Sequence, residues 1–164
     1  MPLPGVAKSY GHLGQRVQLN ECRRVVASGD VFFFLHADSF PPLDALVEIE
    51  AALQNPRVVG GAFEHRFEEH LWSLRFISWI NRRRYFFTRN YYGDQGIFVR
   101  ANVFRSLGGY RDLFMEDLDF SHRLKKLGRT KTVPLPLITS GRRFLTWGPW
   151  RAFLSSCGFF CSIL

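Results

Sequence analysis

An apolar segment that is typical of a β-strand ends on a histidine and a carboxylate. Residues 31–35 are Val-Phe-Phe-Phe-Leu, and His36 and Asp38 follow directly. The five apolar residues lie between a Ser-Gly-Asp turn and a Pro-Pro pair, which predicts a central strand covered on both faces of a sheet. Open α/β sheets bind ligands just beyond the carboxyl ends of such strands. Asp38 could therefore hold a divalent cation that neutralises a diphosphate, or it could cap a helix starting near Pro42.

Three further polar clusters stand where strands should end or helices begin. They are Gly93-Asp94-Gln95-Gly96, Met115-Glu116-Asp117 and Thr139–Phe144. The glycines of the first would let the backbone approach a ligand closely, although a plain turn has the same composition. The acidic pair of the second would also favour a helix N-terminus. The arginines of the third could be ordinary surface residues. Each cluster alone is a weak indication of a site.

Composition restricts the class of protein without identifying its function. A chain of 164 residues with 46% hydrophobic residues can form one domain with a substantial core. Seventeen Phe residues and an aromatic content of 16% indicate aromatic packing, an apolar groove or contact with a membrane surface. The net charge of +8 is uneven, because residues 81–164 hold fifteen basic residues against five acidic ones. That half could face phosphates, nucleic acid or anionic lipid.

Cysteine usage and the chain ends favour a reducing compartment. Cys22, Cys157 and Cys161 form no CxxC pair and are odd in number, so neither a disulfide framework nor a zinc site is indicated. The N-terminus shows no signal-peptide pattern, and the apolar tail is too short to span a bilayer. We therefore expect a cytoplasmic protein, with peripheral contact at the inner face of the membrane.

Helical and strand patterns alternate along the chain, which predicts an α/β layered architecture. The segment from Glu69 to Arg84 has apolar residues on more than one face and ends in three arginines. It could lie on a membrane, line an acceptor groove or be an ordinary buried helix. Gly60-Gly61 predicts a bulge or a close backbone approach. The expected helices are 15–27, 42–53, 69–84, 103–107 and 116–127, and the expected strands are 31–35, 58–63, 97–99 and 131–135.

In this order, the four clusters resemble the family-2 glycosyltransferases with the GT-A fold. The likeness is to a bacterial subgroup with Leu-His-Ala-Asp, Gly-Asp-Gln-Gly, Glu-Asp and Ser-x-Arg-Arg motifs, and it covers roughly residues 11 to 150. It implies a three-layer, Rossmann-like α/β domain over residues 1–150, followed by an apolar tail over residues 151–164. It also implies transfer of a sugar from a nucleotide-diphosphate donor to an acceptor hydroxyl, with inversion and a divalent cation, manganese or magnesium.

The resemblance assigns roles to the acidic residues. Asp38 matches the metal-binding last residue of the family's Asp-x-Asp motif. His36 stands where the first Asp would be, and it could be a neutral ligand, a hydrogen-bond donor to the diphosphate or a packed residue. Asp117 matches the general base that takes the proton from the acceptor hydroxyl, for which a water-poor environment is favourable. Glu116 beside it would orient Asp117 or be structural.

The same resemblance assigns the donor and acceptor contacts. Asp94 and Gln95 would face the donor sugar and the acceptor. Arg142 and Arg143 would lie on the loop that covers the diphosphate, since guanidinium groups pair well with phosphate oxygens. Phe144 would line the path of the sugar.

The chain departs from the family before Val31. Family members normally begin with two strand units that carry most of the recognition of the base and ribose, and neither is found here. The resemblance therefore implies an N-terminally truncated GT-A domain with weak donor binding. A further chain that supplies the missing half would be a partner.

Two other functions remain open from the sequence. Residues 72–91 and 142–151 could form a basic, aromatic-rich binding module for an anionic membrane surface or nucleic acid. Nucleic acid is the less favoured ligand because no nucleic-acid motif accompanies the charge. A structural subunit of a membrane complex, docked through the apolar C-terminus, is the third interpretation.

Overall fold

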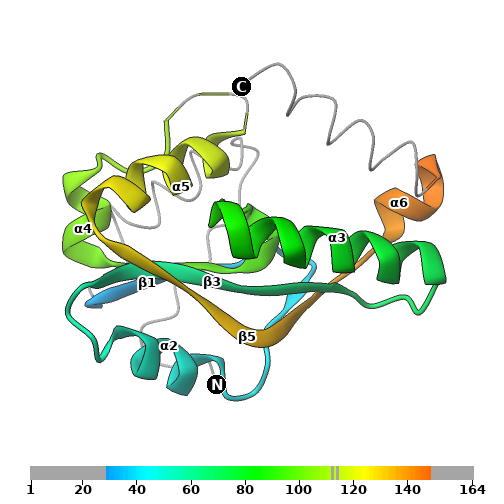
Figure 1. The fold of residues 1–164 in the computed structure, drawn as a ribbon, viewed down its shortest axis with the longest axis horizontal. Helices are drawn as coiled ribbons and strands as arrows, with labels where there is room; N and C mark the ends of the chain where they lie inside the picture. Colours follow the sequence, from blue (N-terminus) through cyan, green and yellow to red (C-terminus); the bar gives the residue numbers. More distant parts are fainter. Residues whose placement is uncertain (1–28, 112, 114, 149–164) are drawn as a thin grey trace.

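The computed structural model describes residues 29–111, 113 and 115–148. These residues form a mixed five-stranded sheet with helices on both faces (Figure 1). The strands are β1 (Val31–Phe34), β2 (Ser39–Phe40), β3 (Val58–Phe67), β4 (Ile97–Arg100) and β5 (Arg129–Thr139). The helices are α2 (Ala45–Leu53), α3 (Trp72–Thr88), α4 (Ala101–Ser106), α5 (Glu116–Leu127) and α6 (Arg142–Trp147), with a 3-10 turn, η1 (Gly93–Gln95).

The strands follow the order β1-β4-β3-β5-β2 across the sheet. Only the β3–β5 pair is parallel, and the other pairs are antiparallel. The prediction that residues 31–35 form a central strand is wrong for the described sheet, because β1 lies at its end with β4 as its neighbour there. The prediction that both faces are covered is confirmed. Phe34 packs toward one cluster of buried side chains and Phe33 toward the other.

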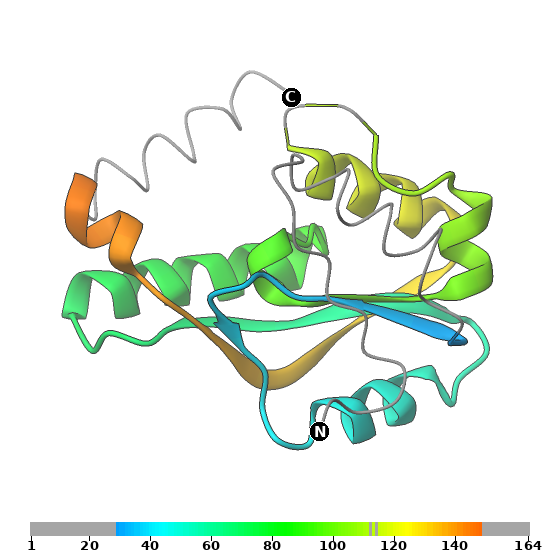
Figure 2. The ribbon, with the colours of Figure 1, turned by 180° about the vertical axis from the view of Figure 1, so that it is seen from behind.

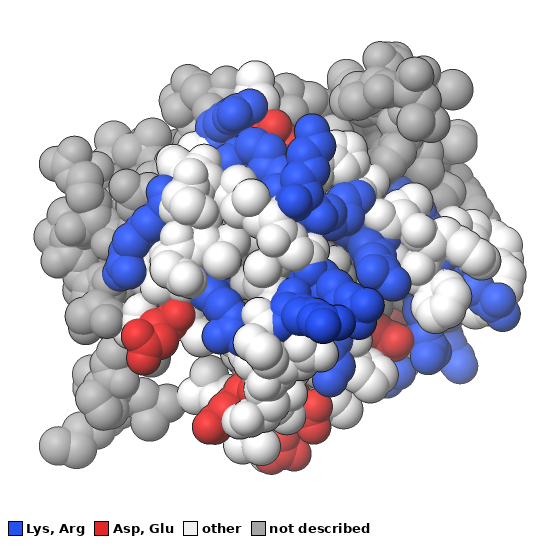
Figure 3. All heavy atoms as spheres, turned by 60° about the vertical axis from the view of Figure 1, so that its left-hand side comes forward, with Lys and Arg blue, Asp and Glu red and all other residues white. Residues whose placement is uncertain are grey.

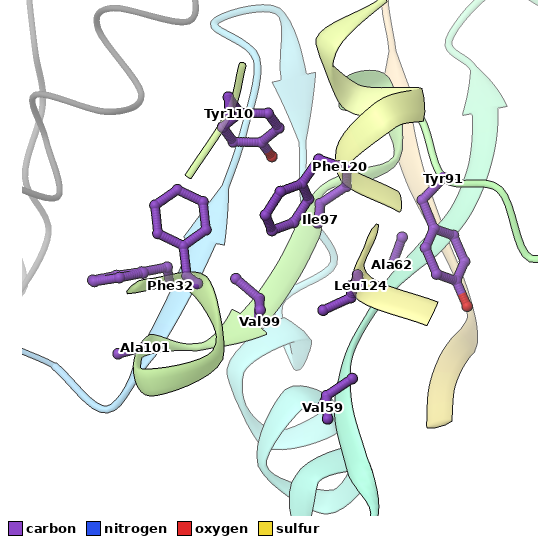
Figure 4. Close-up of a cluster of buried hydrophobic side chains, with 11 residues drawn as sticks. Phe32, Val59, Ala62, Tyr91, Ile97, Val99, Ala101, Tyr110, Phe120 and Leu124 are labelled. Carbon is purple, nitrogen blue, oxygen red and sulfur yellow. The ribbon is translucent and has the colours of Figure 1, made fainter. Parts of the chain in front are cut away.

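Apolar side chains fill both faces of the sheet. Helix α2 lies on one face, and α3, α4 and α5 lie on the other, as the front and back views show (Figures 1 and 2). The larger cluster joins β1, β3 and β4 to α4 and α5, and aromatic rings dominate it (Figure 4). Phe104 contacts Phe32 and Phe120 there, with both pairs of ring centroids 5.3 Å apart. The abundant phenylalanine thus serves in part as core packing.

Two adjacent glycines let β3 pass close to both of its neighbours. A Cβ at Gly61 would lie 1.8 Å from the carbonyl oxygen of Lys131, and one at Gly60 would lie 2.5 Å from the carbonyl oxygen of Phe98. The β3–β5 register also shifts between Val58 and Gly60. The predicted bulge and close approach are therefore confirmed, and both are possible because glycine has no side chain.

Most of the expected elements within the described residues are present, with different ends. Helix 116–127 is confirmed at both ends, whereas α3 begins at Trp72 and ends at Thr88. The predicted strands 58–63 and 131–135 are the middle parts of longer strands. The sequence did not indicate β2, η1 or α6. The expected helix 15–27 and the tail 151–164 lie outside the described residues.

Candidate functional site

Asp117 joins the start of α5 to the loop before β4. Its Oδ2 accepts a hydrogen bond from the backbone N–H of Gly93, and its Oδ1 accepts one from the N–H of Leu118, both at 2.8 Å. Asp117 thus does bond the first turn of its own helix, as a carboxylate near a helix N-terminus can. It also bonds a loop 24 residues earlier in the chain. A helix-terminal role therefore describes only part of what this side chain does.

The residue before α5 has an uncommon backbone conformation. Met115 has a φ of 64° and a ψ of 54°, in the left-handed region that non-glycine residues rarely adopt. Its carbonyl oxygen accepts the N–H groups of Leu118 and Asp119 at 3.1 and 3.2 Å. Such a conformation costs on the order of 1 kcal/mol, and it sets the direction from which α5 presents Asp117.

The surroundings of Asp117 favour a basic carboxylate. Burial raises the pKa of Asp117 above its ordinary value, and this is the largest effect. The hydrogen bonds from Gly93 and Leu118 lower the pKa in part, while the negative charges of Asp94 and Glu116 raise it. A carboxylate that binds a proton more readily than usual is suited to general base catalysis near neutral pH. Glu116 thus contributes through its charge.

The histidine after β1 lies directly against the same loop. A Cβ built at Gly93 would lie 2.3 Å from Nε2 of His36 and 3.0 Å from its Cε1. The imidazole therefore occupies the space where a side chain at position 93 would stand. Glycine at this position lets His36 and Asp117 contact the same residue from two sides.

Gln95 holds the loop in place from within the core. The residue has no exposed surface, and its Nε2 donates to the carbonyl oxygen of Phe63 at 3.2 Å. Its Oε1 accepts the N–H of Tyr92 at 2.9 Å. The family resemblance implies that Gln95 faces the donor sugar and the acceptor. The structure instead gives both ends of the amide backbone partners, so Gln95 positions the loop that carries Asp94.

A buried histidine that the sequence did not indicate lies beside Asp94. The side chain of His65 is 1% exposed, its Nε2 lies 3.7 Å from Oδ2 of Asp94, and neither ring nitrogen has a hydrogen-bond partner. Its ring makes an edge contact with Phe67, with ring centroids 4.5 Å apart. Position 65 lies beyond the end of the predicted strand 58–63. A lone histidine among apolar residues gives no other signal in the sequence.

The end of β5 connects two of the remaining segments. Thr139 Oγ1 lies 3.3 Å from the hydroxyl of Ser39, and it donates to the carbonyl oxygen of Asp94 at 3.3 Å. The backbone N–H of Ser140 donates to the carbonyl oxygen of Asp38 at 3.4 Å. Short β2 pairs with the last residues of β5, which brings the Asp38 turn to the segment before α6.

Asp38 does not cap the helix that follows it. Helix α2 begins at Ala45 with Asp44 at its N-cap, so the capping interpretation of Asp38 is wrong. Within the part of the chain that the structure describes, no group of three or more His, Cys, Asp or Glu side chains could hold a metal ion. A magnesium ion shared with substrate phosphates needs only one or two protein carboxylates, and Asp38 can supply one.

The arginine segment forms the short helix α6, which is fixed to α3 and β3. Glu69 accepts the N–H of Gly141 with both carboxylate oxygens, at 3.0 and 2.7 Å. The ring of Phe144 packs on Phe67 with centroids 4.7 Å apart, and it joins a small cluster below α3. Phe144 thus anchors α6. Arg142 is exposed, and the side chain of Arg143 lies outside what the structure describes.

The four polar clusters of the sequence therefore meet at one edge of the sheet. His36 and Asp117 both lie against Gly93, while Thr139 bonds the carbonyl of the next residue, Asp94. Ser140 bonds Asp38. Segments up to about a hundred residues apart in the chain thus meet around the Gly93 loop, where the Asp117 carboxylate and the His36 imidazole both contact Gly93. Neither the protein-family models nor the curated proteins with which the chain was compared gave a match.

Proposed function

We propose that this chain is a glycosyltransferase of the family-2 type with a GT-A fold. The observation that carries the proposal is the convergence of the four clusters on the Gly93–Gln95 loop. A resemblance built from short motifs gains support when the motifs also lie together in space. The described mixed sheet, with helices on both faces, is compatible with such a domain.

In the proposed reaction Asp117 acts as the general base. Its carboxylate takes the proton from the acceptor hydroxyl while the hydroxyl oxygen attacks the anomeric carbon of the donor sugar. The bond between that carbon and the phosphate oxygen breaks, and the nucleoside diphosphate leaves with the electron pair. The raised pKa of Asp117 makes it a better proton acceptor than an ordinary aspartate.

The leaving diphosphate requires compensating positive charge. A divalent cation, manganese or magnesium, would supply it from the Asp38 carboxylate. Arg142, exposed at the start of α6, would pair with the phosphate oxygens. His36 would donate a hydrogen bond to the diphosphate, since its imidazole lies against Gly93, in the loop that is assigned to the donor.

The proposal includes a partner strand beside β1. Within the described residues β1 pairs with β4, and its other edge carries no strand. An open edge of this kind presents unpaired backbone groups and can accept a further strand. A segment or chain that adds the nucleotide-recognition strands there would complete the donor site.

Calorimetric titration of uridine and guanosine diphosphate sugars, with and without manganese, tests the proposal. We expect manganese-dependent binding that is lost in Asp38→Ala and kept in Asp117→Asn, because Asp38 is assigned to the donor and Asp117 to the acceptor. Asp44→Ala, which removes an exposed carboxylate at the start of α2, is the control for the change in charge. If the folded chain binds none of these donors, or if Asp44→Ala weakens binding as much as Asp38→Ala, the proposal fails.

A further inference from the structure

Helix α3 exposes aromatic side chains along one face. Trp72, Phe76, Trp79 and Phe86 recur at intervals of four, three and seven residues, which places them on one side of an α-helix. Trp72 is 72% exposed, Trp79 is 53% exposed, and Phe86 is 78% exposed. Phe87, at the edge of this face, is exposed to the same degree as Phe86. These five residues are called the aromatic stripe below.

The opposite face of α3 is the one that packs on the protein. Leu74, Ile77 and Tyr85 are buried, and two of them contact the cluster that includes Phe67. The buried face therefore already fixes α3 to the sheet without the aromatic stripe. Large exposed aromatic side chains cost solvation free energy, and a row of them typically marks a surface that binds something apolar.

The charges of α3 are all of one sign. The helix holds Arg75, Arg82, Arg83 and Arg84 and no Asp or Glu. Arg83 lies over the ring of Trp79, 5.4 Å from its centroid, and Phe76 stacks on the same ring at 5.9 Å. Arg82 contacts Glu64 of β3 at 3.1 Å. Exposed aromatics alternate with exposed guanidinium groups, so the face is both apolar and cationic.

The basic character extends beyond α3. On the side of the molecule where α4 and α5 come forward, Lys and Arg form broad patches and acidic side chains are fewer (Figure 3). The chain as a whole has a net charge of +8. An anionic surface would thus be attracted to the molecule before the aromatic stripe makes contact.

We propose that the aromatic stripe docks α3 on the surface of an anionic lipid bilayer. Tryptophan and phenylalanine enter the boundary between headgroups and acyl chains, and arginines beside them pair with lipid phosphates. No helix in the described residues is long and apolar enough to cross a bilayer. Helix α3 would therefore lie in the plane of the interface with its buried face kept on the sheet.

Helix α6 adds further exposed apolar side chains near the beginning of α3. Phe144 fixes α6 to α3 through the cluster with Leu74 and Ile77. Leu145 and Trp147 of α6 are exposed, 46% and 58% respectively. Helix α6 lies near the first turn of α3 (Figures 1 and 2), so these exposed side chains add apolar surface there.

Sedimentation of the purified chain with vesicles tests the proposal. We expect binding to vesicles of phosphatidylcholine with phosphatidylglycerol, and at most weak binding to phosphatidylcholine alone. Raising the salt concentration should weaken binding because it screens the arginines. The double variant Arg75→Gln/Arg83→Gln should lower the partition coefficient about thirtyfold, since each basic residue near an anionic surface contributes about 1 kcal/mol. Trp79→Ser/Phe86→Ser should lower it at least about tenfold.

Two single substitutions away from α3 serve as controls for the loss of an apolar side chain and the loss of a charge. Leu46→Ser removes an exposed apolar side chain from α2 on the other face of the sheet, and Arg57→Gln removes an exposed charge from the turn before β3. Neither should change vesicle binding by more than about twofold. All substituted side chains are exposed, so circular dichroism and thermal unfolding should show that the variants stay folded.

Four results would overturn the proposal. The first is equal binding to neutral and anionic vesicles, and the second is an equal loss of binding in the control and stripe variants. The third is release of the chain from vesicles by a single-stranded oligonucleotide that the chain then binds, which would make nucleic acid the ligand. The fourth is a dimer in solution that the Trp79→Ser/Phe86→Ser variant converts to a monomer, which would make a second copy the occupant. None of these measurements involves a nucleotide sugar, so they do not depend on the proposed catalytic function.

Discussion

Replacing Gln95 by leucine should destabilise the protein through two unmet backbone groups. Leucine fills a similar volume but cannot accept the N–H of Tyr92 or donate to the carbonyl of Phe63. Gln95 has no exposed surface, so water does not reach these groups from its side without a rearrangement of the loop. The loop between Tyr92 and β4 should become less well fixed, and Asp94 with it.

The magnitude follows from the cost of leaving buried polar groups unsatisfied. Each such group costs about 1–3 kcal/mol, and the apolar leucine recovers part of the loss. We expect the free energy of unfolding to fall by about 2–4 kcal/mol, a large share of the stability of a domain this size. Urea titration followed by tryptophan fluorescence and circular dichroism measures it by linear extrapolation.

Gln95→Glu is the matched control for this prediction. Its carboxyl group can still accept the N–H of Tyr92, and when protonated it can also donate to the carbonyl of Phe63. Burial should raise the pKa of the new carboxyl group above its unfolded value. Its stability relative to wild type should therefore be higher at about pH 4 than at about pH 8, and it should fall as the pH rises through that window. A loss below about 1 kcal/mol in Gln95→Leu, or no pH dependence in Gln95→Glu, would refute the assigned role.

Three further predictions concern single residues. Gly61→Ala should lower the free energy of unfolding by about 3 kcal/mol or more, because its Cβ would meet the Lys131 carbonyl, whereas Gly29→Ala should leave it nearly unchanged in urea titration. His65→Phe should leave stability within about 1 kcal/mol of wild type, because no hydrogen bond is lost, and a larger drop would show that the ring nitrogens have partners in solution. The pKa of Asp117 is raised in the folded protein, so the ionised carboxylate should destabilise the fold relative to the protonated form. Wild type should therefore lose stability relative to Asp117→Asn as the pH rises from about 4 to the raised pKa. A difference in the free energy of unfolding that stays constant with pH in urea titrations would contradict this.

Local patterns in the sequence were sufficient for most of the elements. The acidic residues Glu116 and Asp117, which favour a helix N-terminus, and Gly128, which ends a helix, marked both ends of α5. The two glycines of β3 predicted a close backbone approach, because only glycine fits at such points. These features depend on neighbouring residues in the chain, which the sequence displays directly.

Features that depend on distant residues could not be predicted in the same way. The face of Glu69–Arg84 that packs on the sheet could not be chosen, because apolar residues lie on several sides of that helix. The pairing of Gln95 with the Phe63 carbonyl depends on how the loop meets β3, and nothing near position 95 specifies it. The contact of His65 with Asp94 likewise requires knowledge of the tertiary structure. The positions of the four clusters were thus predictable, while the contacts among them were not.

The antiparallel register of β1 and β4 explains why those clusters converge. Phe34, at the carboxyl end of β1, pairs with Ile97, at the amino end of β4. Residues just after β1 and residues just before β4 must therefore lie at the same edge of the sheet. That edge brings His36 to Gly93, and the hydrogen bond from Gly93 brings in Asp117. When two strands are adjacent in a sheet, the residues that follow the first and the residues that precede the second lie side by side only if the strands are antiparallel. Strand direction, which the sequence pattern does not specify, determines whether a site forms at all.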